Sequence, residues 1–117
     1  MIFAAETEER TLHVFPDADT AASHCEGLAV EATIWLFWDD VGNPLVPQFT
    51  VPNQRGLFTN KNGLYHLVST ESRAAGTLDE ALAHITAVIG EAPFTSVNAV
   101  QAHLDLLSDT ASPADMT

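Results

Sequence analysis

The chain has 117 residues with 16 Asp and Glu, 4 Lys and Arg, and a formal net charge of -12 at pH 7. This length fits one domain, and a hydrophobic share of 46% is too high for a disordered acidic tail. The small number of cations argues against a nucleic-acid or anionic-membrane surface, because Lys and Arg supply most phosphate contacts, and no apolar run approaches the roughly 18 residues that span a bilayer.

The N-terminal residues contain no positively charged segment, so they do not predict a secretory signal. Cys25 is the single cysteine of the chain and cannot form an internal disulfide. Small extracellular domains usually need several disulfides. We therefore expect a cytoplasmic protein whose stability comes from its hydrophobic core.

Helical periodicity marks the segment from about residue 18 to residue 28. Small apolar side chains recur on one face, Asp17 is placed to cap the first turn, and Gly27 is placed to end the helix. A stripe of small side chains predicts close packing against a sheet.

Two further helices are predicted towards the C-terminal end. One covers about residues 78–89 and begins with a capping box of Thr77 and Glu80. The other covers about residues 97–107, where apolar residues recur three or four positions apart. Because a short connection separates them, we expect an antiparallel helix pair.

Runs of β-branched and aromatic residues predict strands in the rest of the chain. Residues 39–43 are typical of a hairpin turn, and the prolines of the strand that follows predict an edge position or a bulge. An Asn-Gly pair predicts a second turn at residues 60–63. The predicted strands cover residues 11–15, 33–38, 45–51, 57–59 and 64–69.

This order of elements predicts an α+β domain with a mostly antiparallel sheet of four to five strands and helices chiefly on one face. We expect one domain over residues 1–108. Residues 109–117 lack apolar periodicity and are expected to form a flexible C-terminal tail.

The strand predicted at residues 33–38 is apolar on both faces, because alternation places Trp35 and Phe37 opposite Leu36 and Trp38. If helices cover one face only, Trp35 and Phe37 either belong to a second buried layer or form an aromatic surface for a partner. Large aromatic side chains are mostly buried, which favours the first alternative.

Four acidic residues flank this strand in the sequence: Glu26 and Glu31 precede it, and Asp39 and Asp40 follow it. Close carboxylates can act as an acid and base pair or bind a hard cation. The spacing after residue 39 does not match a calcium loop, and its composition is typical of a solvated turn. We therefore expect no metal here.

The sequence contains no recognisable catalytic motif. The five histidines lie one to each predicted element, without the spacing of a zinc-peptidase motif. Cys25 lies on the apolar stripe of its helix, where a thiol behaves as a small hydrophobe. A nucleophile elbow and a glycine-rich phosphate loop are both missing. We expect no cofactor and no enzymatic activity.

Three stretches in the first half of the chain carry a resemblance to a known class of proteins. They are LHVFPD at residues 12–17, AASHCEGL at residues 21–28, and IWLFWD at residues 34–39 followed by GNPL at residues 42–45. This pattern resembles that of small acidic bacterial proteins that serve as immunity partners in toxin systems. The resemblance rests on structural elements, so it implies a shared fold more than a shared activity.

The main hypothesis is a cytoplasmic protein that neutralises a cationic protein, such as a toxin domain, without an active site of its own. An acidic surface speeds encounter with a basic partner and can occupy the phosphate-binding groove of a nuclease. The opposing interpretation is that the charge serves solubility alone. Trp35 is the expected aromatic anchor, and the expected charged contacts are Glu26, Glu31, Asp39 and Asp40.

Two other hypotheses remain open. The chain is alternatively a small-molecule-binding or enzymatic α+β domain, with a pocket near the aromatic strand lined by Arg55, Tyr65 and His66; a deep cavity with these polar groups converging on it would favour this. The third hypothesis is a homodimer that forms through the sheet edge or the aromatic face.

Overall fold

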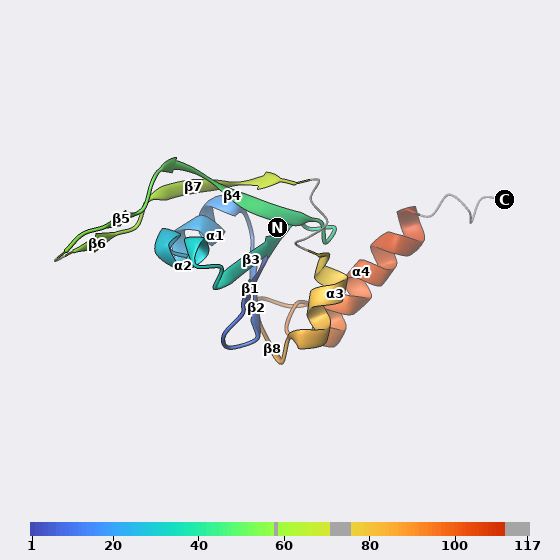
Figure 1. The fold of residues 1–117 in the computed structure, drawn as a ribbon. Coiled ribbons are helices and arrows are strands. Elements are labelled where there is room, and N and C mark those ends of the chain that lie inside the picture. The colour runs from blue at the N-terminus through green and yellow to red at the C-terminus, as the bar shows by residue number, and fades with distance from the viewer. Residues whose placement is uncertain (58, 71–75, 112–117) are drawn as a thin grey trace.

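A six-stranded sheet organises the protein (Figure 1). The computed structural model describes residues 1–57, 59–70 and 76–111. The strands are β1 (Ile2–Glu6), β2 (Thr11–Phe15), β3 (Trp35–Trp38), β4 (Pro44–Val51), β7 (Leu64–Ser69) and β8 (Ala87–Ile89). Their order across the sheet is β7-β4-β3-β1-β2-β8, and all neighbours are antiparallel except β2 and β8, which are parallel. The α+β class and the mostly antiparallel sheet are therefore confirmed.

The sheet has more strands than the four to five predicted, because β1 and β8 were not expected. β1 lies in the centre, with Phe3 opposite both Val14 of β2 and Trp38 of β3. No helix or strand was predicted for residues 1–6. In the structure they form a strand within the sheet, and Phe3 is fully buried.

Helices cover both faces of the sheet, so the prediction of helices chiefly on one face was wrong. The first face is covered by α1 (Ala18–His24) and α2 (Gly27–Glu31), and the second by α3 (Leu78–Ala81), the 3-10 turn η2 (Leu82–His84) and α4 (Val97–Ala111). The physical reason is that β1 and β3 are apolar on both faces, and each face needs its own cover.

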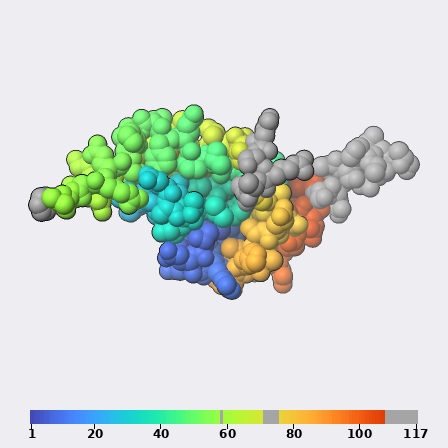
Figure 2. Space-filling model, viewed as in Figure 1, coloured from blue at the N-terminus to red at the C-terminus, as the bar shows by residue number. Residues whose placement is uncertain are grey.

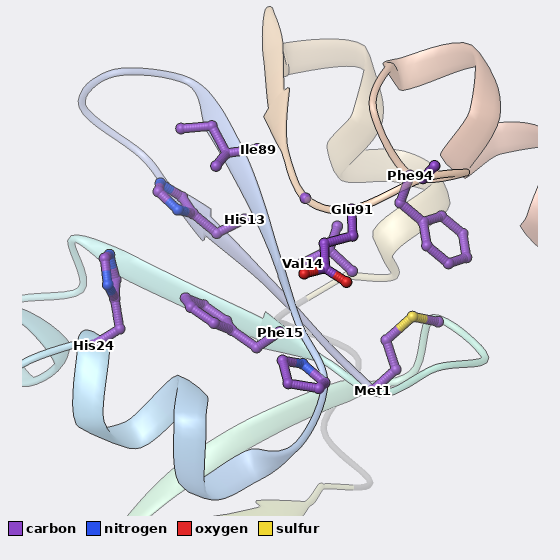
Figure 3. Close-up of a pocket in the computed structure, with 11 residues that line it drawn as sticks. Met1, His13, Val14, Phe15, His24, Ile89, Glu91 and Phe94 are labelled. Carbon is purple, nitrogen blue, oxygen red and sulfur yellow. The ribbon is translucent and has the colours of Figure 1, made fainter.

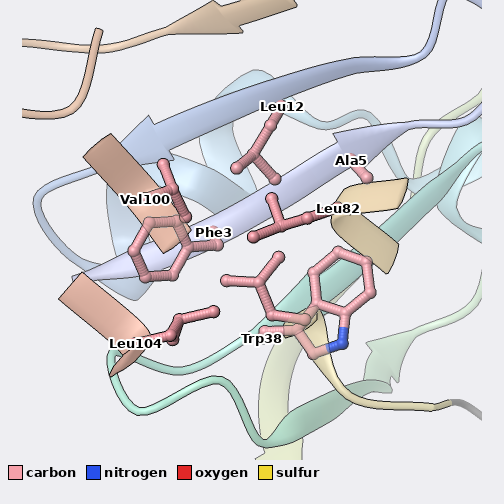
Figure 4. Close-up of a cluster of buried hydrophobic side chains, with 8 residues drawn as sticks. Phe3, Ala5, Leu12, Trp38, Leu82, Val100 and Leu104 are labelled. Atoms are coloured by element: carbon pink, nitrogen blue, oxygen red, sulfur yellow. The ribbon is translucent and has the colours of Figure 1, made fainter. Parts of the chain in front are cut away.

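Alternation along β1 and β3 divides the core into two clusters. Phe3 and Trp38 face α3 and α4 and pack with Leu78, Val100 and Leu104 (Figure 4). The indole Nε1 of the buried Trp38 donates to the Gly76 carbonyl at 3.2 Å. The second cluster, on the α1 and α2 side, contains Ile2, Ala4, Phe15, Ala21, Cys25, Val30 and Phe37.

The first predicted helix is divided into α1 and α2. Asp17 caps α1 as expected, since its carboxylate accepts from Thr20 N at 2.7 Å, and this bond lowers the pKa of Asp17. Gly27 does not end a helix but begins α2. A Cβ at Gly27 would lie 2.5 Å from Asn53 Oδ1, so the missing side chain allows the close approach of a distant segment.

The second predicted helix is much shorter than expected. The capping box of Thr77 and Glu80 is present, but the helix gives way to η2 and then to β8. The prediction was wrong here because the segment after Ile85 is rich in β-branched residues, which favour extended backbone, and it pairs with β2 at the edge of the sheet. Thr86 N, for example, donates to Arg10 O at 2.8 Å. The expected helix pair is therefore interrupted by a strand.

The third predicted helix is confirmed and is longer than expected. Ser96 Oγ accepts from Ala99 N at 3.1 Å at its start, and α4 continues to Ala111. Residues 109–111 thus belong to a helix and not to the predicted tail. Residues 112–117 lie outside the described residues.

A long hairpin leaves the body of the protein between β4 and β7 (Figures 1 and 2). Residues 52–63, which we call the arm, contain the short strands β5 (Gln54–Arg55) and β6 (Asn60–Lys61). Gly56 N donates to Thr59 O at 2.7 Å, and Asn60 and Lys61 belong to strand β6, so the turn is not at residues 60–63 as predicted. Residue 58 of the predicted strand 57–59 lies outside the described residues.

β4 lies between β3 and β7 and not at an edge, but its pairing is irregular. The pairing of β4 with β7 shifts register between Phe49 and Val51, which confirms the predicted bulge. Within the described residues, no helix has both the length and the apolar character needed to cross a membrane.

Candidate functional site

The five predicted partner contacts lie at the two ends of β3. Glu26 precedes α2 and Glu31 is its last residue, so both lie near the start of the strand, where Trp35 also lies. Asp39 and Asp40 follow the end of the strand, in the turn that leads to β4. The structure therefore separates them into two groups that no single side-chain cluster unites.

Trp35 is half-buried, whereas its neighbour on the same face, Phe37, is buried at 2% exposure. The Trp35 ring lies edge-on to two imidazoles, with centroid distances of 5.0 Å to His13 and 5.7 Å to His24. Phe37 is therefore a core residue, and Trp35 belongs chiefly to an aromatic cluster of the protein itself.

Glu31 already has partners within the chain. Its carboxylate accepts from Asn53 Nδ2 at 2.6 Å and lies 3.7 Å from an Arg55 guanidinium nitrogen. Both partners belong to the arm, so Glu31 holds the arm against α2. Glu26 is exposed and precedes α2 without a side-chain capping bond.

Asp39 is a turn-forming residue. Its carboxylate accepts from Val41 N at 3.0 Å and from Asn43 N at 2.9 Å, as the solvated-turn interpretation predicts. Asp40 is exposed, and its carbonyl lies 2.8 Å from His103 Nε2 on α4. The turn between β3 and β4 is thus fixed against α4.

Two acidic residues that the sequence analysis did not single out lie beside this turn. Gln101 Nε2 donates to Asp79 Oδ1 at 2.6 Å and to Asp105 Oδ1 at 2.9 Å. A hollow of about 290 Å³ lies between these carboxylates and the turn, and its lining includes Asn43. The net charge of -6 in residues 71–117 was the one available signal, since no spacing links α3 to α4.

The three residues of the alternative ligand site are not brought together. Tyr65 and His66 are consecutive in β7 and point to opposite faces of the sheet. The Tyr65 hydroxyl donates to Cys25 O at 2.6 Å, and its burial raises the pKa of the phenol. Arg55 lies on the arm beside Glu31. No shared polar centre results.

A larger cavity lies elsewhere, and the sequence analysis did not find it. A groove of about 600 Å³ runs along β2 and the segment after β8, and we call it the β2–β8 groove (Figure 3). His13 and His24 form one wall, Met1 and Phe94 lie at the other end, and the Glu91 carboxylate lies between them. Most of the remaining lining is apolar.

The two imidazoles of this groove lie close together, with ring centroids 5.3 Å apart. Partial burial, and next the nearby His24, lower the pKa of His13 below its ordinary value of 6.5, against a smaller opposing effect of Glu6. His13 is therefore held in its neutral form at neutral pH. Because His13 and His24 are eleven residues apart on different elements, no local motif could have indicated this pair.

Among the residues that the structure describes, no three His, Cys, Asp or Glu side chains are grouped so that they could hold a metal ion. Comparisons with protein-family models, curated proteins and solved structures give no match to this chain.

Proposed function

We propose that this chain is an acidic cytoplasmic protein that binds and neutralises a cationic protein, as immunity proteins do with toxins. The observation that carries this proposal is the pair Asp79 and Asp105, whose carboxylates share one neutral donor, the Gln101 amide. One amide leaves both negative charges uncompensated beside a hollow of about 290 Å³. A Lys or Arg side chain of a partner fits that charge and that space.

The rest of the charge distribution supports the proposal. Among the described side chains, which cover residues 1–57, 59–70 and 76–107, the one salt bridge between Lys or Arg and an acidic side chain is that of Arg55 with Glu31. The remaining acidic charge is thus not neutralised inside the described part of the molecule. Uncompensated charge of one sign accelerates encounter with a partner of the opposite sign.

The test is association with a cationic toxin domain, measured by calorimetry between about 50 and 500 mM salt. We expect a complex whose affinity falls steeply with salt. The double variant Asp79→Asn and Asp105→Asn should weaken it by about tenfold or more. Glu8→Gln, which removes an exposed charge from the turn between β1 and β2, is the matched control.

Two results would overturn the proposal. One is the lack of any complex at 50 mM salt, which would leave solubility as the role of the charge. The other is a complex that responds neither to salt nor to the Asp79 and Asp105 substitutions.

A second candidate function, the binding of a small apolar ligand, is favoured by the β2–β8 groove. Its volume of about 600 Å³ lies in the usual range of ligand sites, and its few polar groups are His13, His24 and Glu91. Because Trp35 contacts both imidazoles, its fluorescence should report uncharged aromatic compounds that enter the groove. The Trp35→Phe variant measures the contribution of Trp38, and an unchanged Trp35 signal with every compound argues against this function.

A further inference from the structure

We propose that β7 is the contact through which two copies of this chain pair edge to edge. β7 is the outermost strand of the six-stranded sheet and pairs with β4 on one side (Figure 1). No strand of the described residues lies on its other side. This inference does not depend on a cationic partner.

The backbone direction of β4 follows from its pairing with β3. Asp39 N donates to Asn43 O at 2.9 Å, so these two residues face each other through their backbone groups. Two positions further into the hairpin, Phe37 and Leu45 are partners in the same register. Since backbone groups alternate in direction along a strand, the N–H and C=O of Leu45 point towards β3.

The same alternation determines which groups of β7 are free. Val46 and Gln48 of β4 point towards β7, where their partners are Val68 and His66. The bond from Thr50 Oγ1 to Leu64 O agrees with this assignment, since Leu64 has the same parity as His66. The remaining β7 backbone groups point outwards, away from the sheet; they belong to Tyr65, Leu67 and Ser69.

β7 lacks the features by which proteins usually protect an edge strand. Its sequence, LYHLVS, contains no proline and no Lys, Arg, Asp or Glu. β7 spans six residues, which is an average strand length. The bulge between β4 and β7 has its extra residue in β4, so β7 itself is regular. Such an edge is competent to add another strand.

The charge distribution identifies a second copy as the occupant. Residues 41–70 contain no acidic residue, and their two cations are Arg55 and Lys61 on the arm. The acidic residues of the described chain all lie before residue 41 or after residue 78, and their carboxylates repel a second molecule of net charge -12. The wing formed by β4, β7 and the arm is therefore where two copies approach without like-charge contacts.

A two-fold axis through Leu67 satisfies the edge in an antiparallel register. In this register Leu67 meets the second copy's Leu67, and Tyr65 meets the second copy's Ser69, so that outward N–H groups face outward C=O groups. Each arm then extends past the end of the other copy's β7. This brings Lys61 of one copy towards the turn at Asp39 and Asp40 of the other, which is a favourable charge arrangement.

Sedimentation velocity from 1 to 500 μM at 150 mM salt tests the dimer. We expect a monomer–dimer equilibrium, which Ser69→Pro weakens by about tenfold or more because it removes an outward N–H without touching the bonds to β4. Ser69→Ala keeps that N–H and should dimerise normally. Lys61→Glu, which places an acid on the wing outside β7, should also weaken the dimer. This variant leaves β7 unchanged, so it tests the dimer even if Ser69→Pro does not fold.

Hydrogen exchange identifies the surface directly. The amides of Tyr65, Leu67 and Ser69 should gain protection at high protein concentration, whereas those of His66 and Val68 should be protected at every concentration. A monomer throughout the concentration range overturns the inference. So does a dimer in which Ser69→Pro and Ser69→Ala associate equally, or one that forms without new protection at the three outward amides.

Discussion

Asn53 Oδ1 accepts a hydrogen bond of 2.6 Å from the backbone N–H of Gly63, across the base of the arm. The amide nitrogen of the same side chain donates to Gly27 O at 2.9 Å, at the start of α2. One asparagine therefore joins both strands of the hairpin to the helix beneath them. Gly63 allows this approach, since a Cβ there would lie within 2.0 Å of Val51 O.

Replacement of this asparagine should loosen the arm. Asn53→Ala leaves part-buried backbone groups without partners, and we expect a loss of about 1–3 kcal/mol in the free energy of unfolding measured with urea. Gln54→Ala changes an exposed neighbouring residue and is the control. Equal stability of the two variants would mean that the Asn53 bonds do not hold the arm.

The core on the α3 and α4 side should respond strongly to a cavity. Leu78 is fully buried next to Trp38, so Leu78→Ala should lower the free energy of unfolding by about 2–5 kcal/mol. Leu57, on the arm, is 90% exposed, and Leu57→Ala should change stability by less than about 0.5 kcal/mol. Urea unfolding of both variants gives the comparison, and a small effect at Leu78 would contradict the packing of α3.

His13 should make stability depend on pH. Its pKa is lowered in the folded state, so between that pKa and 6.5 the unfolded chain binds more protons than the folded one. Stability that is present above pH 6.5 is therefore lost as the pH falls towards the folded pKa. His13→Gln should reduce the difference in unfolding free energy between pH 7.5 and pH 5.5.

The control for this experiment is His66→Gln, at an exposed position on β7. An NMR titration of His13 should give a midpoint below 6.5. A midpoint above 6.5 would reverse the expected direction and would show that the acidic residues nearby outweigh burial.

Cys25 should be unreactive in the folded protein. Its side chain has no exposed surface, and burial raises the pKa of the thiol to about 12. Because the thiolate is the reactive form, a disulfide reagent at pH 8 should modify the native protein about 100-fold more slowly than the urea-unfolded protein. Similar rates in the two states would indicate that the contact between α1 and the sheet opens readily.

The sequence predicted those parts of the fold that local chemistry determines. The strand at residues 11–15, the cap at Asp17 and the hairpin turn after Asp39 were all confirmed, since each depends on neighbours in the chain. The sequence failed where distant segments decide the conformation. The sequence predicted that Gly27 ends a helix. In the structure Gly27 begins α2, and its missing side chain leaves room for Asn53 of the arm, whose side chain donates to Gly27 O.

The same limit applies to the surfaces. Asp79 and Asp105 come together through Gln101 only after α3 and α4 pack, and His13 meets His24 only after α1 folds onto β2. No spacing rule connects these residues. Asp39 and Asp40 were found because a turn has a local signature, although that signature concerns hydrogen bonding within the turn and says nothing about a partner.

The late position of α4 in the chain has a consequence for synthesis on the ribosome. The strands β1 to β7 emerge first, but the residues that cover Phe3 and Trp38 come from α3 and α4, the last elements of the described chain. A nascent chain that ends before Val97 has every strand of the sheet and still exposes part of one apolar face. Exposed apolar surface is prone to aggregation, so we expect such chains to bind a chaperone until α4 has left the exit tunnel.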